Sequence, residues 1–249
     1  MMDAWRLILA GRQSAAEQMA YDEALAQDPI PTVRLFTWDP PAVSVGWKQP
    51  TPDWVASLAR HGLRVESVER PTGGGVALHG SDLSVSIVVP RTSALPLGVL
   101  LCAVCESAVR LCASVGVTAE VMADAGPHDG RIDYCLADVS PYAVLVGGRK
   151  LGGFAVRRYP ETWLIQGSLL IRPVPEALSA AMPGALLERL QDRAVSLAEA
   201  AGTLLQERQL ATGWAEHWVL WWETSSRQAA DGSTQPLPTA YCQLPTSSP

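Results

Sequence analysis

The chain has 249 residues, of which 48% are hydrophobic and 18% are charged, so it can bury one large core. The net charge of −6 and the lack of a basic stripe speak against a general nucleic-acid-binding protein. The N-terminus shows no basic-then-apolar signal segment, and the longest apolar runs, such as Ser84–Pro90 and Leu97–Ala103, are shorter than a membrane span. Five scattered cysteines do not suggest a disulfide framework. We therefore expect a cytoplasmic protein without a membrane or nucleic-acid partner.

Short β-branched and aromatic runs in the first part of the chain predict strands. They lie at Trp5–Leu9, Val33–Trp38, Ala42–Gly46, Leu63–Val68, Val76–His79 and Leu83–Val89. After the first of them, Ser14 opens a capping box, which predicts a helix to about Ala26. Thr51 and Pro52 predict the N-terminus of a second helix, which Gly62 is placed to end.

The rest of the chain mixes helix and hairpin signals. The predicted elements are a helix from Pro96 to about Val115, a loop over Ala119–Arg131, a hairpin of Tyr142–Val146 and Leu151–Arg157, a strand at Trp163–Ile171, and mostly helix over Pro183–Glu223. The hairpin is predicted because a primed turn needs φ > 0, which two glycines supply. From Thr224 onward we expect a poorly ordered tail. Helices among antiparallel strands, without regular strand–helix–strand alternation, predict an α+β domain.

The helix after Pro96 carries a Cys-x-x-Cys pair, Cys102 and Cys105. Such a pair is typical of zinc or redox sites, but here it lies in an aliphatic helix without a second ligand pair. Buried, unreactive cysteines are therefore the favoured interpretation, and no metal site is expected. A metal or redox protein that uses this pair is a weaker alternative.

The most unusual stretch runs from Arg70 to His79 and contains three glycines, Gly73, Gly74 and Gly75. Glycines accept φ > 0 and carry no Cβ, so the backbone there can lie directly against a ligand. Arg70 is a permanent cation able to bind a carboxylate or phosphate, and His79 ends the stretch with a polar ring. Taken alone, the stretch also fits a tight turn between two strands.

A second glycine-rich stretch, Gly147–Gly153, surrounds Lys150. We expect the Lys150 ammonium to point into space that the glycines keep open. Cys135 falls in the approach to this hairpin, in a predicted loop. A loop thiol near a lysine is enriched in thiolate, the form that acts as a covalent nucleophile. Taken alone, Cys135 also fits an incidental cysteine.

Four segments in a fixed order carry a resemblance to a known group of enzymes. They are Glu17–Leu25, Arg34–Gly46, Arg70–His79 and Gly148–Ala155. In turn they resemble the first helix, the R-x-Y-x-W-x-P-P-A-x-S-x-G strand pair, the R-x-x-G-G-G-x-x-x-H ligand loop and the G-x-K-I-x-G-x-A lysine turn of the biotin/lipoate protein ligase and octanoyltransferase superfamily. The resemblance covers residues 1–175.

The resemblance implies a central mixed, largely antiparallel sheet flanked by helices, with an apolar tunnel for an acyl chain beside the lysine. It implies a catalytic core at 1–175. The helical signals and the polar composition that follow predict a helical extension packed on the core at 176–223 and a poorly ordered tail at 224–249. The implied catalytic residues are Cys135 and Lys150. The implied substrate-binding residues are Arg70, Gly73, Gly74, Gly75, His79, Gly152, Gly153 and Ala155.

Two chemistries compete within the superfamily. Lipoate ligases activate a free acid with ATP as an acyl-adenylate, whereas octanoyltransferases use a thiol to take the acyl group from an acyl carrier protein thioester. Tyr134–Leu136 stands where ligases commonly show Gly-Arg-Asn-Asp, and it resembles the cysteine-bearing segment of one octanoyltransferase branch. The residues after Ile171 are too few for the additional domain of full-length ligases. We therefore expect an acyltransferase without a cofactor; the alternative is a ligase that uses ATP and magnesium.

The resemblance also implies a two-step mechanism. Cys135 attacks the acyl thioester of an acyl carrier protein, and a lysine of an acceptor then takes the acyl group. The expected acceptor is the glycine-cleavage carrier protein or a 2-oxoacid dehydrogenase lipoyl domain. Lys150 would stabilise the thiolate and polarise the carbonyl oxygen. Ile165–Ser168 lacks a histidine frequent in the family, which favours a second alternative, a non-catalytic acyl-binding homologue.

Overall fold

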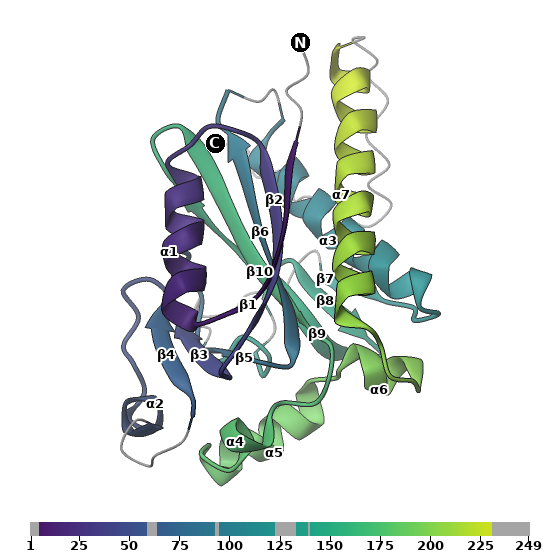
Figure 1. Cartoon of the computed structure of the whole chain (residues 1–249). Coiled ribbons are helices and arrows are strands. Elements are labelled where there is room, and N and C mark those ends of the chain that lie inside the picture. Colours follow the sequence, from purple (N-terminus) through teal and green to yellow (C-terminus); the bar gives the residue numbers. More distant parts are fainter. Residues whose placement is uncertain (1–4, 59–63, 93–94, 123–132, 139, 231–249) are drawn as a thin grey trace, which may run out of the picture.

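The computed structural model of the protein describes residues 5–58, 64–92, 95–122, 133–138 and 140–230 (Figure 1). The helices are α1 (Ala15–Ala26), α2 (Asp53–Ser57), α3 (Leu97–Ser114), α4 (Glu176–Ser179), α5 (Gly184–Arg193), α6 (Leu197–Ala201) and α7 (Glu207–Ala230). The strands are β1 (Arg6–Gln13), β2 (Thr32–Trp38), β3 (Ala42–Val45), β4 (Glu66–Glu69), β5 (Ala77–His79), β6 (Asp82–Pro90), β7 (Glu120–Met122), β8 (Ala143–Val146), β9 (Arg149–Arg158) and β10 (Thr162–Leu170).

Two sheets form the centre of the molecule. The larger has the order β1-β2-β6-β10-β9-β8-β7, and the smaller has the order β4-β3-β5. β1 runs parallel to β2 and β4 parallel to β3, whereas the other pairings are antiparallel. The structure thus confirms the predicted α+β fold with a mixed, largely antiparallel sheet flanked by helices.

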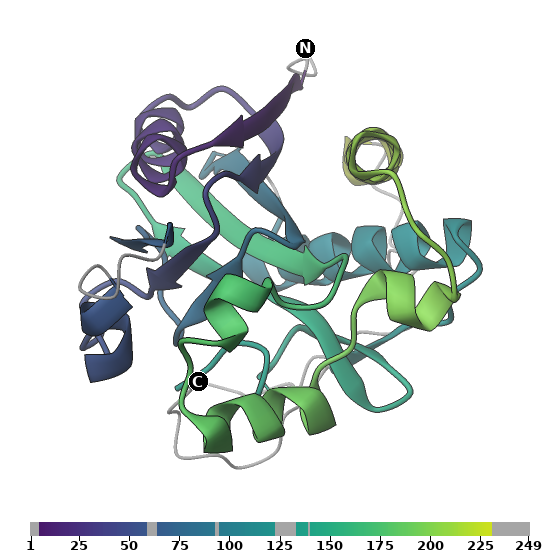
Figure 2. The same ribbon diagram turned by 60° about the horizontal axis from the view of Figure 1, so that its bottom comes forward.

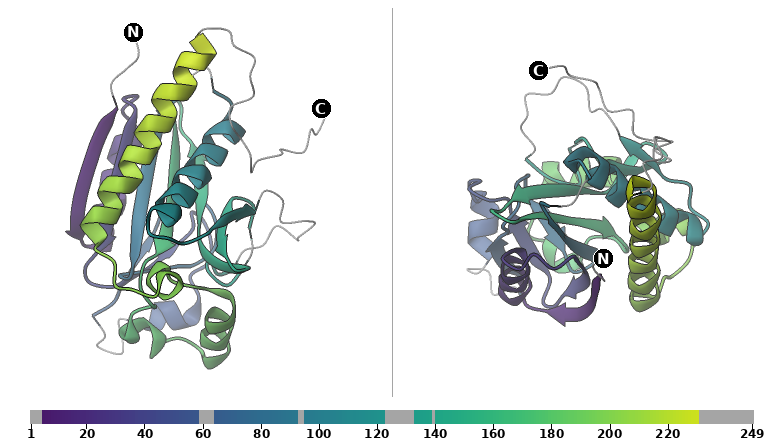
Figure 3. Two further views of the ribbon diagram at one scale, coloured as in Figure 1. Left: turned by 90° about the vertical axis from the view of Figure 1, so that its right-hand side faces the viewer. Right: turned by 90° about the horizontal axis from the view of Figure 1, so that it is seen from above.

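Helices cover both faces of the larger sheet (Figure 2, Figure 3). Leu83, Val85 and Ile87 of β6 pack in the cluster that contains α3 and α7, whereas Val88 packs with Leu25 of α1. Because neighbouring strand residues point to opposite faces, α1 lies on one side of the sheet and α3 and α7 lie on the other. β2 and β6 are buried almost throughout, and in the first part of β6 the polar side chains of Ser84 and Ser86 alternate with apolar ones.

Helix α3 is apolar because it is a core helix. By length and composition it would also suffice to cross a membrane, which the sequence analysis did not foresee. More than half of the helix is buried, and its apolar residues belong to the main core cluster together with those of α7. Trp214 of α7 donates its indole N–H to Ser107 of α3 at 2.9 Å, which ties the two helices together.

The structure confirms most predicted elements and corrects three. Pro52, not Thr51, occupies the N-cap of α2, without a side-chain cap, and Gly62 lies outside the described residues. Glu120–Met122 form strand β7 rather than part of a loop, because they pair with β8; residues 123–131 lie outside the described part. The predicted start of a tail at Thr224 falls inside α7, and residues 231–249 of the predicted tail lie outside the described residues. The capping box at Ser14 is present as predicted.

The hairpin between β8 and β9 forms as expected. Gly147 and Gly148 have φ of +56° and +75°, the combination that a type I′ turn requires. The pairing of β8 with β9 also shifts by one residue between Val144, which pairs with Gly152, and Leu145, which pairs with Lys150. This turn places Lys150 as the second residue of β9, close to the exposed glycine pair.

Candidate active site

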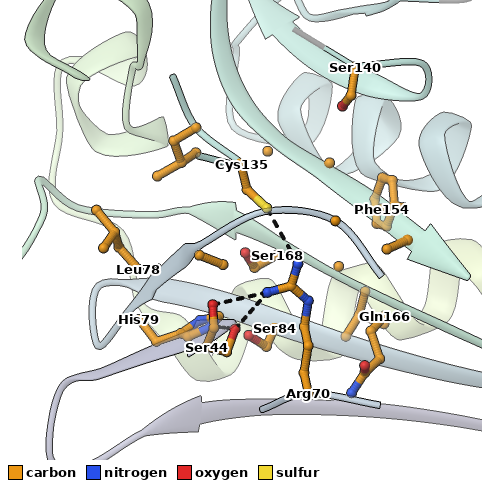
Figure 4. Close-up of a pocket in the computed structure, with 18 of the residues that line it drawn as sticks. Ser44, Arg70, Leu78, His79, Ser84, Cys135, Ser140, Phe154, Gln166 and Ser168 are labelled. Atoms are coloured by element: carbon orange, nitrogen blue, oxygen red, sulfur yellow. Dashed lines mark hydrogen bonds between the residues drawn. The ribbon is translucent and has the colours of Figure 1, made fainter. Parts of the chain in front are cut away.

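A cavity of about 320 Å³ is enclosed by the larger sheet, the smaller sheet and the loops that contain Gly73 and Cys135 (Figure 4). Of the predicted site residues, those that line it are Arg70, Gly73, Gly74, His79, Cys135, Lys150, Gly152, Gly153 and Ala155. Its apolar walls include Met19, Phe36, Leu78, Val85, Leu136 and Phe154. The structure therefore brings the predicted nucleophile, the predicted lysine and the glycine loop to one largely apolar cavity. Gly75 does not line the cavity.

Cys135 is held by backbone pairing beside the glycine loop. Its amide N–H donates to the Val76 carbonyl at 2.8 Å, and the Val76 N–H donates to the Asp133 carbonyl at 2.8 Å. The Asp138 carboxylate closes the same segment by accepting from the Tyr134 amide at 2.8 Å. Cys135 is a free, partly exposed thiol. Its sulfur thus has a fixed place on the cavity wall.

Lys150 is almost completely buried, with 3% of its surface exposed. Its ammonium donates to the Asp138 carbonyl at 2.8 Å and to Ser140 Oγ at 3.0 Å. Burial lowers the pKa of Lys150, whereas the nearby negative charges of Cys135 and Asp138 act in the opposite direction. The lysine is therefore bonded to the segment that carries Cys135, and its ammonium faces the same cavity. Ser140, which the sequence analysis missed, carries no motif signal that could have revealed it.

Arg70 lies inside the wall of the site, with 8% of its surface exposed. Its guanidinium donates to the Gly73 carbonyl at 2.8 Å and the Gly75 carbonyl at 2.7 Å. It also donates to Ser44 and to the sulfur of Cys135. Gly75 therefore contributes to the site through its carbonyl rather than by facing the cavity.

His79 is also buried and fully hydrogen-bonded. Its ring lies between Ser44 Oγ and Asp82 Oδ2, each at 2.8 Å from a ring nitrogen. The ring stacks on Trp38 with centroids 4.0 Å apart. Ser44 and Asp82 were not predicted as site residues, although Ser44 is the serine of the A-x-S-x-G segment and could have been found there.

A second buried hydrogen-bond network begins at Gln166, which also lines the cavity. Gln166 accepts from Thr72 Oγ1 at 2.7 Å and donates to Asp22 Oδ2 at 2.6 Å. Asp22 forms a fully buried ion pair with Arg34 at 2.6 Å. Burial raises the pKa of Asp22, and the attraction of Arg34 opposes this. Through Thr72, this network connects the glycine loop to Asp22 of α1 and Arg34 of β2, and its hydrogen bonds help to position the loop.

The helix cysteines are remote from this chemistry. Cys105 and Cys112 are free and buried, and burial raises the pKa of Cys112 to about 12 and that of Cys105 further. Cys102 is buried on the same helix and is disulfide-bonded, not a free thiol, which corrects the expectation for this cysteine. Within the described part of the chain, no three histidine, cysteine or acidic side chains are grouped to hold a metal ion. The Cys102–Cys105 alternative thus has no supporting geometry there.

Of the three glycines, Gly74 is the one whose backbone conformation favours glycine over other residues. It has φ of +90°, and a Cβ there would lie 2.9 Å from Arg70 Nη2. Gly74→Ala is therefore expected to lower the free energy of unfolding by about 1–3 kcal/mol, through backbone strain and displacement of the guanidinium. Denaturant unfolding measures this. Gly73→Ala is the matched control, because its Cβ would meet open space; an equal loss in both variants would contradict the prediction.

Comparisons with known proteins agree with this arrangement. The family model of the lipoyl protein ligase A/B catalytic domain matches residues 14–211. Octanoyltransferase LipM of Symbiobacterium thermophilum is 33% identical over 223 residues, covering 80% of this chain and 79% of the relative. Octanoyltransferase LipM of Kyrpidia tusciae is 33% identical over 242 residues, covering 86% and 87%.

A solved structure shares the fold. It is that of the bipartite lipoate protein ligase of Thermoplasma acidophilum, described with its E2 lipoyl domain, with a TM-score of 0.66, 17% identity, and coverage of 97% of this chain and 98% of that chain. At this identity the likeness concerns the fold alone. The extent of the family match and the identity to the relatives show that the chain belongs to the lipoyl protein ligase A/B catalytic domain family.

Proposed function

We propose that this protein is an octanoyltransferase of protein lipoylation, which moves a medium-chain acyl group from an acyl carrier protein thioester to a lysine of a lipoyl-accepting carrier domain. The observation that carries the proposal is the free thiol of Cys135 on the wall of a largely apolar cavity that also contains the buried ammonium of Lys150. The names of the relatives from Symbiobacterium and Kyrpidia support the same reaction.

In the first step the Cys135 thiolate attacks the carbonyl carbon of the acyl thioester. A new carbon–sulfur bond forms, and the negative charge moves to the carbonyl oxygen. The intermediate then collapses, the carrier thiolate leaves and takes up a proton, and the acyl group stays on Cys135. The Lys150 ammonium supplies positive charge in a buried setting, where it stabilises a developing oxyanion more strongly than in water.

In the second step the uncharged amine of the acceptor lysine attacks the carbonyl carbon of the acyl-enzyme. An amide bond forms, the amine loses a proton, and Cys135 leaves as the thiolate. The net reaction converts a thioester and an amine into an amide and a thiol. Because the thioester is already activated, we propose that no ATP, metal ion or other cofactor takes part.

The cavity suits an unbranched acyl chain. Its apolar lining includes Met19, Phe36, Val85 and Phe154. Burying each methylene of a chain there contributes about 0.8 kcal/mol, which favours medium chains over acetyl groups. Gly167 makes room for Phe154, since a Cβ at 167 would lie 2.1 Å from the Phe154 ring.

The proposed acceptor is the glycine-cleavage carrier protein or a 2-oxoacid dehydrogenase lipoyl domain, in line with the E2 lipoyl domain described for the Thermoplasma ligase. Acyl carrier protein is the proposed donor. We place the reaction in the cytoplasm, where the predicted donor is a soluble protein.

A comparison of two donors tests this function. The protein is mixed with octanoyl acyl carrier protein without ATP, and separately with free lipoate, ATP and magnesium. The expected result is a mass increase of one octanoyl group on the Cys135 peptide in the first mixture, and transfer to a lipoyl domain on its addition. Lipoyl-adenylate in the second mixture with no adduct in the first would instead identify a ligase. Neither product would identify a non-catalytic binding protein.

A further inference from the structure

Arg70 is the cation that contacts the sulfur of Cys135. Its Nη2 lies 3.6 Å from Cys135 Sγ, within the range of a hydrogen bond to sulfur (Figure 4). The charge of Lys150 also acts on Cys135, but its hydrogen bonds go to oxygen atoms of Asp138 and Ser140. A positive charge next to a thiol favours the thiolate, and burial strengthens the effect because less water screens it.

We propose that Arg70 maintains Cys135 as the thiolate, and that a buried chain of Asp82, His79 and Ser44 holds Arg70 in position. The inference rests on the proposed function, in which Cys135 is the nucleophile. In this assignment Arg70 is a catalytic residue because it touches the reacting sulfur, and His79 is a positioning residue that acts through Ser44. Lys150 then serves the carbonyl oxygen of the acyl group.

The guanidinium of Arg70 has no donor left for a substrate. Arginine carries five N–H groups. Nε donates to the Gly73 carbonyl, and Nη1 donates to the carbonyl and the hydroxyl of Ser44, each at 3.1 Å. The two N–H groups of Nη2 are shared among three acceptors, the carbonyls of Gly73 and Gly75 and the sulfur of Cys135. Binding of a substrate carboxylate or phosphate would break these bonds, so the structure favours a role toward the sulfur over the substrate-binding role predicted from sequence.

The chain behind Arg70 is continuous and buried. Ser44, His79 and Asp82 expose 0%, 5% and 3% of their surfaces. Ser44 Oγ lies 2.8 Å from His79 Nε2, and His79 Nδ1 lies 2.8 Å from Asp82 Oδ2. A buried carboxylate is thus connected to the buried guanidinium through two intermediate groups, which offsets the cost of burying the charge of Arg70.

The hydrogen bonds of this chain all run in one direction. The Asp82 carboxylate also accepts from the Gly80 amide and from Ser84 Oγ, so it is an acceptor for His79 Nδ1–H as well. With a proton on Nδ1, the assigned hydrogen bonds run from the Ser44 hydroxyl to Nε2 and from Arg70 to Ser44 Oγ. This tautomer satisfies every member, and the stacked ring of Trp38 fixes the plane of the imidazole.

Alkylation of Cys135 in the free enzyme tests the role of Arg70 without an acyl donor. The rate at which iodoacetamide labels the Cys135 peptide at pH 7 is followed by mass spectrometry. In Arg70→Met we expect a rate about tenfold lower, because less thiolate is present. At pH 10 the rates should converge, because there the thiol ionises without help. Equal rates at pH 7, or a deficit that persists at pH 10, would overturn the proposal.

Arg157→Met is the matched control. Arg157 also ties down the glycine loop, donating from Nη1 to the Pro71 carbonyl at 2.9 Å, but none of its hydrogen bonds reaches the sulfur. Its alkylation rate at pH 7 should stay within about twofold of the wild-type rate. A tenfold loss in this variant too would show that loop packing, rather than the charge at the sulfur, sets the reactivity.

The positioning chain is tested by two substitutions of His79. His79→Leu removes both hydrogen bonds, and we expect alkylation at pH 7 to slow by about three- to tenfold. His79→Gln can still donate to Asp82 and accept from Ser44, so it should restore most of the rate. If His79→Leu alkylates at the wild-type rate, the chain does not position Arg70. Acyl transfer that survives in Cys135→Ala would instead refute the proposed function, whatever these rates are.

Discussion

Replacement of Cys135 by alanine is expected to lower acyl transfer to a lipoyl domain by at least about 10⁴-fold, because the covalent step is lost. Cys135→Ser should lose nearly as much, since a hydroxyl in this position is hardly ionised at neutral pH. The acyl adduct seen by mass spectrometry should vanish in both variants. Transfer is measured as the octanoyl-dependent mass increase of the acceptor domain.

The control for this experiment is a cysteine of the core. Cys112 is fully buried on α3 and lies away from the cavity, so Cys112→Ala should keep the adduct and the transfer, at a cost of about 1 kcal/mol in stability. Full transfer by Cys135→Ala would exclude the covalent mechanism. Loss of transfer in both variants would indicate a general defect in folding rather than in chemistry.

The sequence was sufficient to predict the parts of the site that depend on local signals. The glycine pair before Lys150 predicted a tight turn, and the three consecutive glycines predicted backbone that can lie directly against a ligand. The resemblance of Tyr134–Leu136 to a cysteine-bearing octanoyltransferase segment led us to expect Cys135 near Lys150, and both line one cavity. These predictions succeeded because a glycine turn or a capping box is specified by residues that are close in the chain.

What the sequence did not reveal depends on contacts between distant segments. Arg70 was interpreted as a ligand for a substrate anion because the sequence shows its charge. The five atoms that accept its hydrogen bonds become apparent only in the folded protein. Ser44 and Asp82 look like ordinary strand residues until β3 pairs with β5 and brings Ser44 beside His79. Glu120–Met122 form β7 only because they pair with β8, since a three-residue strand at a sheet edge is too short to show a pattern of its own.

Substitution of Lys150 by methionine is expected to reduce acyl transfer by about 10²–10⁴-fold, while the Cys135 thiol stays in place. The side chains have similar length, but methionine cannot donate to the Asp138 carbonyl or to Ser140, and it brings no charge to the acyl carbonyl. Lys150→Arg should be defective too, because a planar guanidinium fork cannot take the place of the compact, buried ammonium that donates to the Asp138 carbonyl and to Ser140. Wild-type transfer by Lys150→Met would show that Arg70 alone supplies the necessary charge.

The same variant should change the pH dependence of stability, because the pKa of Lys150 is lowered by burial. Between this lowered pKa and the usual lysine value of 10.5, the unfolded chain binds a proton at Lys150 that the folded protein lacks. In that window the free energy of unfolding of the wild type therefore rises with pH relative to Lys150→Met. At neutral pH, where the wild type must bury an ammonium, its advantage over the variant is smallest. Denaturant unfolding of both proteins at pH 7 and pH 10 measures the difference, and a difference that shrinks as the pH rises would show that the ammonium is favoured by its site.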